Sequence, residues 1–110
     1  MIGLIGIAIF AATISLSVDR VPTINVEPHC HDVAARAAPV GDVVSCLRVE
    51  QAARDQLVKE WAEFAAPDKS HCLRLSSLAV QPTYTELLTC LELARDVRKL
   101  RVNEHSSIEE

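Results

Sequence analysis

Four cysteines are the residues of this chain best suited to covalent chemistry. They are Cys30, Cys46, Cys72 and Cys90, and no two of them form a Cys-x-x-Cys pair of the kind used for thiol exchange. An even number of cysteines in a short exported chain is typical of a disulfide framework. We therefore expect two structural disulfide bridges.

Three histidines lie next to these cysteines and could add metal-binding chemistry. His29 and His31 flank Cys30, and His71 precedes Cys72. Imidazole and thiolate are good ligands for zinc or copper, but a closed zinc site would need reduced thiolates, which an oxidising compartment does not provide. We expect exposed histidines beside disulfides, with His29, His31 and His71 only weak metal candidates and no cofactor.

One charged pair lies within an apolar stripe instead of on a solvated face. Glu50 and Arg54 are four residues apart, in the order that favours an ion pair on a helix. The pair could contact a polar ligand or supply a general base. The structural alternative is that the pair satisfies itself and fixes how the helices dock, with Tyr84 or Arg98 as a further partner. We favour the structural role.

The sequence gives little support for catalysis or for nucleic-acid binding. It contains no Gly-x-Ser-x-Gly elbow, no glycine-rich phosphate loop and no His-Glu-x-x-His motif. Asp68, Ser70 and His71 are close in sequence, but neighbours on a helix cannot face one another as a catalytic triad must. The net charge of −4, from 11 basic and 15 acidic residues, argues against nucleic acid as a partner. We expect no enzymatic activity.

The beginning of the chain resembles a signal peptide. Residues 1–17 contain no charged side chain, and their apolar run is shorter than the roughly 20 residues of a membrane span. Small residues at Ser15 and Ser17 favour cleavage before Val18. No basic residue precedes the run, so an uncleaved anchor, a misassigned start codon and a buried first helix are alternatives. We expect a periplasmic or secreted protein with no stable membrane insertion after cleavage.

The rest of the chain is predicted to be all-α. Apolar residues recur every three or four positions between prolines, which is typical of amphipathic helices. An extended arm, 18–27, precedes a helical domain at 28–102, and a polar, acidic and frayed tail, 103–110, follows it. The expected fold is a small bundle of about four helices stapled by two disulfides. The helices are predicted at 28–37, 42–65, 68–79 and 84–102.

Two of these helices have a clear apolar face. The fourth opens with a capping-box pair, Thr83 and Glu86. Basic residues near its predicted end complement the helix dipole; they are Arg95, Arg98, Lys99 and Arg101. The inward face of the second helix is predicted to hold Val43, Cys46, Leu47, Ala53, Leu57, Val58, Trp61, Phe64 and Ala65. That of the fourth holds Tyr84, Leu87, Cys90, Leu91, Ala94 and Val97.

The aromatic residues of the body are few and fall on these faces. Trp61, Phe64 and Tyr84 are its only aromatic side chains. We expect them to pack in the core. The alternative is that they line a pocket or a partner groove, because small disulfide-tied bundles can open around a lipid or bind another protein.

Helix geometry ranks the possible cysteine pairings. If neighbouring helices run antiparallel, Cys30 lies opposite Cys46, and Cys72 faces Cys90 across the turn at Pro82. A bridge from Cys46 to Cys72 is disfavoured, since a long helix would separate them by roughly 15–20 Å and a disulfide tolerates about 7 Å between Cα atoms. Consecutive pairing is therefore preferred, and pairing of Cys30 with Cys72 and of Cys46 with Cys90 is the alternative.

The region around the last three cysteines resembles a known family. It reads SCLRVEQAARDQLVKEWAEFAAPDKSHC, followed by QPTYTELLTCLELARDVRKL. This order of Cys, Glu, Ala-Arg, Trp, Cys, Pro-x-Tyr and Leu-x-Cys is similar to a family of small exported helical proteins of alphaproteobacteria, especially of the rhizobial group. The resemblance covers roughly residues 26–101. It implies a leader and a helical body tied by four cysteines, and it implies no activity.

These features together favour an exported helical protein that binds rather than catalyses. The first hypothesis is a non-catalytic binding or protein-interaction module with an unknown protein partner. The alternative is a carrier of a small apolar ligand or a metal ion in the cell envelope, and an enzyme is the third class. The sequence leaves the oligomeric state open.

Overall fold

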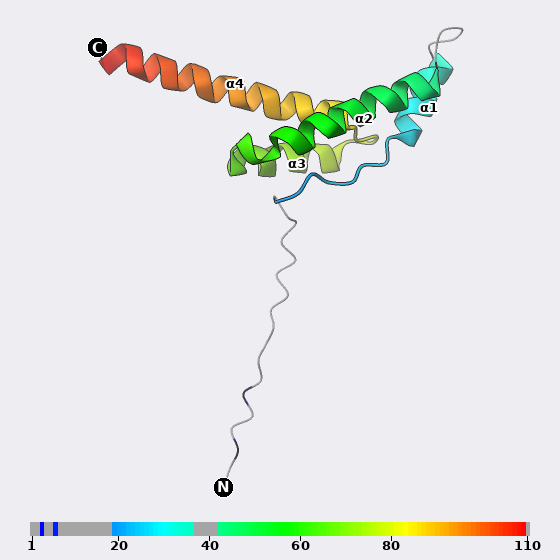
Figure 1. The fold of residues 1–110 in the computed structure, drawn as a ribbon, viewed down its shortest axis with the longest axis horizontal. Helices are drawn as coiled ribbons and strands as arrows, with labels where there is room; N and C mark the ends of the chain where they lie inside the picture. The colour runs from blue at the N-terminus through cyan, green and yellow to red at the C-terminus, as the bar shows by residue number, and fades with distance from the viewer. Residues whose placement is uncertain (1–2, 4–5, 7–18, 37–41, 110) are drawn as a thin grey trace.

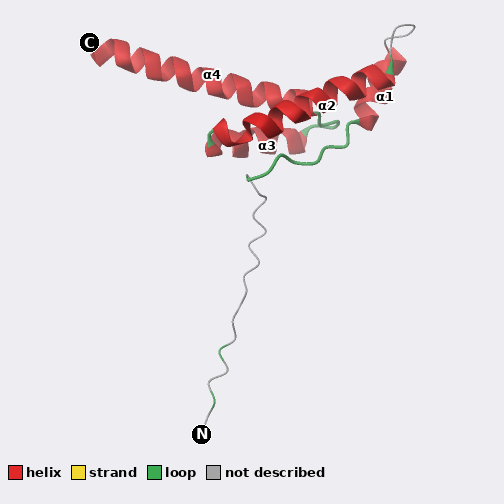
Figure 2. Ribbon diagram, viewed as in Figure 1, coloured by secondary structure: helices red, strands yellow, loops and turns green. Residues whose placement is uncertain are grey.

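The computed structural model describes residues 19–36 and 42–109, together with Gly3 and Gly6. The rest of the predicted signal peptide, with its cleavage site, lies outside the described residues. The described chain is helical and contains no strand, which confirms the all-α prediction (Figures 1 and 2). Its elements are α1 (Glu27–Arg36), α2 (Val43–Glu60), a short 3-10 helix η1 (Trp61–Glu63), α3 (Ala66–Leu78) and α4 (Tyr84–Glu109).

Local capping sets where the helices begin. Asp42 adopts an extended conformation before α2, and its carboxylate accepts a hydrogen bond of 2.9 Å from the Val44 N–H. Thr83 caps the start of α4, because its hydroxyl oxygen accepts a hydrogen bond of 3.1 Å from the Glu86 N–H. This is the threonine half of the predicted capping box. Each cap satisfies an N–H group that has no partner inside its own helix.

Helices α2 and α4 run in the same direction, and α3 runs against both. Glu50 of α2 lies beside Tyr84 at the start of α4, and ten residues further on Glu60 contacts Arg95. Residues of α3 meet α4 in reverse order, with Cys72 bonded to Cys90. Figure 1 shows this arrangement, with α1 beside the N-terminal end of α2. The core lies between α2, α3 and α4. Its buried members are Ala53, Leu57, Trp61, Phe64, Cys72, Tyr84, Leu87 and Leu91.

Both disulfides join consecutive cysteines. The Cα atoms of Cys30 and Cys46 are 5.4 Å apart, and those of Cys72 and Cys90 are 5.8 Å apart. These distances are ordinary for disulfides. The preferred pairing is therefore confirmed. One bridge ties α1 to α2, and the other ties α3 to α4.

Some sequence-based boundaries and faces were wrong. The second helix was predicted to reach residue 65, but α2 ends at Glu60 and the chain tightens into η1. Val58 and Val97 were predicted to face inward, but they are 55% and 45% exposed. Both follow the helical period, yet no neighbouring helix covers them. Periodicity identifies an apolar face but does not show how far along the helix a partner extends.

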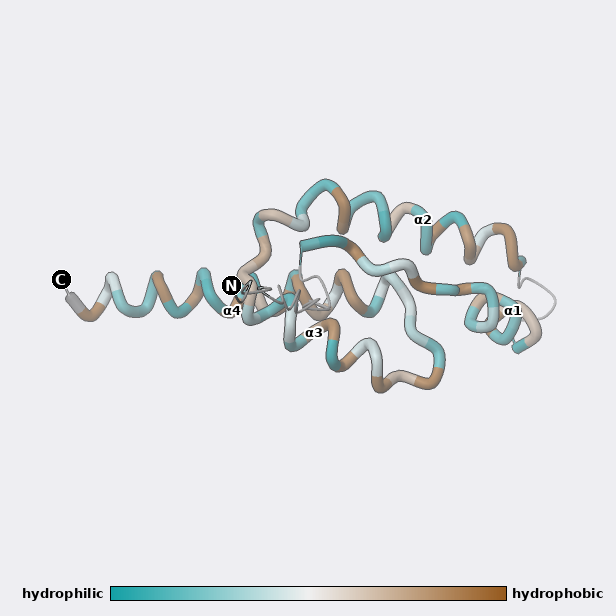
Figure 3. The backbone as a smooth tube through the Cα atoms, turned by 90° about the horizontal axis from the view of Figure 1, so that it is seen from below, coloured by the Kyte–Doolittle hydropathy of each residue, from teal (hydrophilic) through white to brown (hydrophobic). Residues whose placement is uncertain are grey.

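The fourth helix is longer than predicted. Its expected end was residue 102, with a frayed tail after it, but α4 continues through Glu109. No glycine or proline follows Pro82, so nothing in the sequence stops the helix. Its last part extends beyond the bundle (Figure 3). The predicted basic cluster therefore lies along the helix instead of at its C-terminal end.

Candidate binding site

The Glu50 carboxylate lies inside the bundle, where it caps a different helix. Glu50 is only 3% exposed. One of its oxygens accepts hydrogen bonds from the backbone N–H groups of Tyr84, at 2.7 Å, and Thr85, at 3.3 Å, and the other accepts from the Thr85 hydroxyl. A carboxylate at this position satisfies N–H groups that α4 cannot satisfy itself and complements the positive end of its dipole. Glu50 therefore fixes the start of α4 against α2.

Arg54 takes no part in this arrangement. It is half-buried one turn further along α2, and no ion pair joins it to Glu50. Arg98, the other suggested partner, binds Asp68 of α3 instead. The structure thus brings Glu50 together with Tyr84, through the tyrosine backbone, and leaves both arginines outside this site.

Tyr84 connects the start of α4 to the N-terminal arm. Its ring is buried in the core, and its hydroxyl oxygen accepts a hydrogen bond of 2.8 Å from the Ile24 N–H. Val21, Ile24 and Val26 of the arm pack against the same core. The arm is therefore held along the bundle by one polar contact and several apolar ones. Trp61 and Phe64 are also buried, as core aromatics.

Removing the Tyr84 hydroxyl should loosen the arm without unfolding the bundle. Tyr84→Phe keeps the ring in the core but leaves the Ile24 N–H without its acceptor. We expect a loss of about 1 kcal/mol in the free energy of unfolding. The substitution should increase the rate of hydrogen exchange at Ile24 more than at Leu57, which lies in the core on α2. Equal exchange at Ile24 in the variant and the parent would contradict this role.

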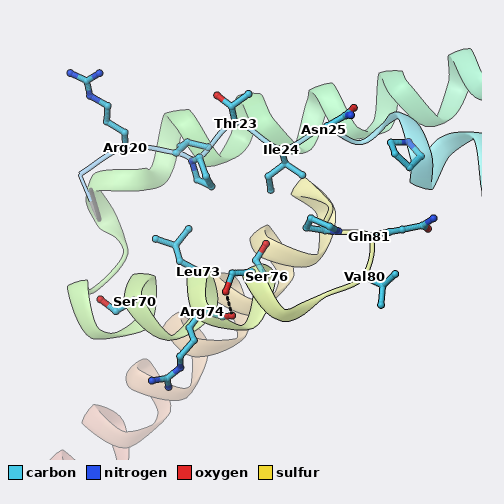
Figure 4. Close-up of a pocket in the computed structure, with 15 residues that line it drawn as sticks. Arg20, Thr23, Ile24, Asn25, Ser70, Leu73, Arg74, Ser76, Val80 and Gln81 are labelled. Atoms are coloured by element: carbon cyan, nitrogen blue, oxygen red, sulfur yellow. Dashed lines mark hydrogen bonds between the residues drawn. The ribbon is translucent and has the colours of Figure 1, made fainter. Parts of the chain in front are cut away.

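A groove lies between this arm and α3 (Figure 4). Its volume is about 1080 Å³, and the loop from Val80 to Pro82 closes one end. Side chains of the arm form one wall, and side chains of α3 form the other. The apolar residues that line it are Val21, Pro22, Ile24, Pro28, Leu73, Val80 and Pro82, and the polar ones include Thr23, Asn25, Ser70, Ser76, Ser77 and Gln81.

None of the candidate site residues identified in the sequence lines this groove. Glu50, Trp61, Phe64 and Tyr84 lie in the core beneath the helices, and Arg54 is on α2. The sequence does contain a signal for one wall, because Pro22 in the arm favours an extended chain. It contains no comparable signal for the position of α3 opposite the arm.

Ion pairs hold the other end of the bundle. Arg95 contacts Glu60 at 3.1 Å, and Arg98 donates two hydrogen bonds to Asp68, one of them 2.9 Å long. Hydrogen bonds from Gln56 and Arg95 hold the pKa of the Glu60 carboxyl below its ordinary value. The bond from Arg98 likewise lowers the pKa of Asp68. These pairs join α4 to α2 and α3, so their role is to fix helix packing.

Cation–π contacts add to the same end. The Arg95 guanidinium lies 5.0 Å from the centre of the Phe64 ring, and the Lys69 ammonium lies 5.3 Å from that of Trp61. Such contacts favour the cation over the face of the ring. The basic residues therefore cover the aromatic part of the core. They do not gather into a separate site.

The weak metal candidates lie apart. His29 and His31 are on α1, and His71 is on α3, where its Nδ1 lies 3.3 Å from the Arg74 guanidinium. Within residues 19–36 and 42–109, no group of three or more histidine, cysteine, aspartate or glutamate side chains could hold a metal ion. All four cysteines are in disulfides.

Among the residues described, no helix combines the length and the apolar character needed to cross a membrane. No protein-family model matches the chain, and neither does any curated protein or solved structure.

Proposed function

We propose that this chain is an exported, non-catalytic binding module, and that the groove between the arm and α3 is its binding site. The observation that carries the proposal is the groove itself, with a volume of about 1080 Å³ and mostly apolar walls. Concave, mostly apolar pockets with a few polar groups are typical of small-molecule sites. The two disulfides are compatible with an oxidising compartment, and the apolar leader supports export.

The walls of the groove are tied to the rest of the molecule by separate links. The Cys72–Cys90 disulfide fixes α3 to α4. The bond from the Ile24 N–H to Tyr84 fixes the arm to the start of the same helix. Both walls are attached to α4, so the distance between them is fixed before a ligand binds. A preformed site loses less conformational entropy on binding.

The residues that line the groove support binding rather than catalysis. Three serines line the groove, Ser70, Ser76 and Ser77. Among the residues that the structure describes, no histidine, aspartate, glutamate or cysteine lines it with them. A serine nucleophile needs an adjacent base to accept its proton. These hydroxyl groups are therefore suited to hydrogen bonding with a ligand.

Of the two forms of the binding hypothesis, the groove favours a carrier of a small apolar ligand. A protein partner would be favoured by a broad exposed apolar surface, and α4 does present Leu93, Val97 and Leu100 on one face. That face is a narrow stripe among charged residues. The groove, in contrast, has two walls and a closed end, which suits an apolar molecule of limited size.

A neutral apolar fluorophore tests this function directly. N-phenyl-1-naphthylamine should bind the oxidised, exported protein with a rise in fluorescence. Ser77→Phe places a ring in the groove and should weaken the binding about tenfold, since about 1.4 kcal/mol of lost contact is enough for that change. The control is Ser107→Phe on α4. Both serines are exposed and donate to a backbone oxygen of their own helix, but Ser107 lies outside the groove.

The possible results distinguish the hypotheses. Weaker binding in Ser77→Phe alone would support the groove as the site. Equal loss in both variants would contradict it, and so would an absence of binding to the parent protein. Circular dichroism and melting curves should show that both variants are folded.

A further inference from the structure

The charged and amide side chains around the groove point away from its interior. The guanidinium groups of Arg20 and Arg74 extend outward on opposite sides of the two walls (Figure 4). The side chains of Thr23 and Asn25 lie on the outer side of the arm. No aspartate or glutamate of the described chain lines the groove. Among the residues that the structure describes, no charged side chain therefore points into the space between the walls.

The two walls are apolar where they face each other. Ile24 extends from the arm toward α3, and Leu73 extends from α3 toward the arm. Both are partly buried and pack against the core. A charged group that enters such surroundings without a partner of opposite charge loses its hydration, at a much higher cost than a neutral group. In charge, the interior of the groove is therefore complementary to a neutral molecule.

One hydroxyl group interrupts this apolar interior. Ser76 lies three residues after Leu73 on α3, and its hydroxyl points toward the arm (Figure 4). Ser70 lies at one end of the groove, and the Gln81 side chain extends away from it. Ser76 is half-buried, whereas Ser70 and Ser77 are exposed. Ser76 is therefore the polar side chain best placed to meet a ligand between the walls.

The Ser76 hydroxyl has no hydrogen-bond partner within the described chain. A serine in a helix often bonds back to its own helix. The Ser77 hydroxyl does so, because it donates to the Arg74 carbonyl at 2.7 Å, but Ser76 forms no such bond. The described side-chain atoms that are sealed from solvent without a partner belong to Glu60 and Arg95. The Ser76 oxygen is therefore open to the groove, where a hydroxyl can both donate and accept.

We infer that the ligand is an uncharged molecule with an apolar body and one hydrogen-bonding oxygen, a ketone or an alcohol, that meets the Ser76 hydroxyl. This inference rests on the proposed function, since it names the ligand class of the same groove. The apolar body lies between Ile24 and Leu73. A volume of about 1080 Å³ leaves room for it, because pockets for small ligands occupy about 300–1,000 Å³. The serine hydroxyl donates to a ketone and accepts from an alcohol.

Displacement of the neutral fluorophore by a matched pair of ligands tests the inference. Decan-2-one and 2-methyldec-1-ene have nearly the same shape, but the ketone has an oxygen where the alkene has a CH₂ group. Ser76→Ala should weaken the binding of decan-2-one about fivefold, which corresponds to the loss of about 1 kcal/mol. It should leave the binding of 2-methyldec-1-ene unchanged. The affinity of N-phenyl-1-naphthylamine is measured in each variant, so that displacement converts to ligand affinity.

A second serine provides the matched control. Ser107→Ala removes a hydroxyl from α4, outside the groove, and should leave the binding of both ligands unchanged. Both substitutions place alanine, the residue most favourable to a helix, within a helix, so both variants should fold.

The charge of the ligand is tested with decanoate at pH 8. We expect decanoate to displace the fluorophore only at a concentration more than about tenfold higher than that of decan-2-one. The reason is that no cation inside the groove replaces the hydration of the carboxylate.

The outcomes separate this inference from the proposed function. Decanoate that binds as tightly as decan-2-one would overturn the uncharged ligand. An unchanged affinity for decan-2-one in Ser76→Ala, or an equal loss for the ketone and the alkene, would overturn recognition of an oxygen by Ser76. In each of these cases the apolar site still stands, provided that the fluorophore binds and Ser77→Phe weakens its binding. If the fluorophore does not bind the parent protein, both proposals fail.

Discussion

Replacing both Cys72 and Cys90 by alanine should lower the free energy of unfolding by about 3 kcal/mol. The bridge closes a loop with a sequence separation of 18, and this length sets the entropy that the cross-link removes from the unfolded chain. Cys72 is only 1% exposed and belongs to the core, so the substitution also removes buried contacts there. Stability of this size is a large part of what a small domain has.

The second disulfide provides the comparison. Cys30 and Cys46 have a separation of 16, so the chain-entropy effect is also about 3 kcal/mol. Their bridge, however, lies outside the main core, and among the described helices α1 packs only against α2. We expect Cys30→Ala with Cys46→Ala to free α1 locally. The bundle of α2, α3 and α4 should keep a cooperative melting transition.

Calorimetry and hydrogen exchange measure the difference between the two pairs. In the Cys72/Cys90 variant, the melting temperature should fall and exchange should become faster throughout α2, α3 and α4. In the Cys30/Cys46 variant, the increase should be confined to α1 and the residues next to it. Equal, global effects of the two pairs would contradict the view that one bridge supports the core and the other supports an attached helix. Free-thiol titration of the parent protein should find no reactive thiol.

The cysteine pairing could be predicted because it depends on local features. Helix periodicity and the turn at Pro82 are visible in the sequence, and they bring Cys72 opposite Cys90. The burial of Glu50 could also be seen, since it lies among apolar residues on its helix face. Its partners could not be predicted. They are 34 and 35 residues away and meet it only because α2 and α4 run in parallel.

The groove could not be predicted for a related reason. The extended arm was expected from its sequence, but the groove needs the arm to lie opposite α3. That placement depends on the hydrogen bond from Ile24 to the Tyr84 hydroxyl, which joins residues 60 apart in sequence, and on the packing of Ile24 against the core. Sequence periodicity describes one element at a time, so it contains no information on a space that two elements enclose.

Glu50→Ala should lower the free energy of unfolding by about 3 kcal/mol, because two backbone N–H groups at the start of α4 lose their acceptor, each at about 1–3 kcal/mol when buried. Tyr84 is buried, so water cannot easily replace the carboxylate at its N–H. Glu50→Gln keeps one carbonyl oxygen as an acceptor but loses the charge that complements the helix dipole. We expect an intermediate loss of about 1–2 kcal/mol for this variant.

The control for Glu50 is Glu63→Gln, a carboxylate on the adjoining 3-10 helix whose side chain is 68% exposed and lies 3.9 Å from Arg95. It should change the free energy of unfolding by less than about 0.5 kcal/mol. Glu50 does not line the groove, so binding of N-phenyl-1-naphthylamine below the melting temperature should be unchanged in Glu50→Gln. If Glu50→Gln kept the stability of the parent and lost a binding activity instead, the carboxylate would be a ligand contact. Denaturant titration of the three variants, with probe binding measured on the same samples, separates these two roles, because capping of α4 requires that stability change while the groove remains intact.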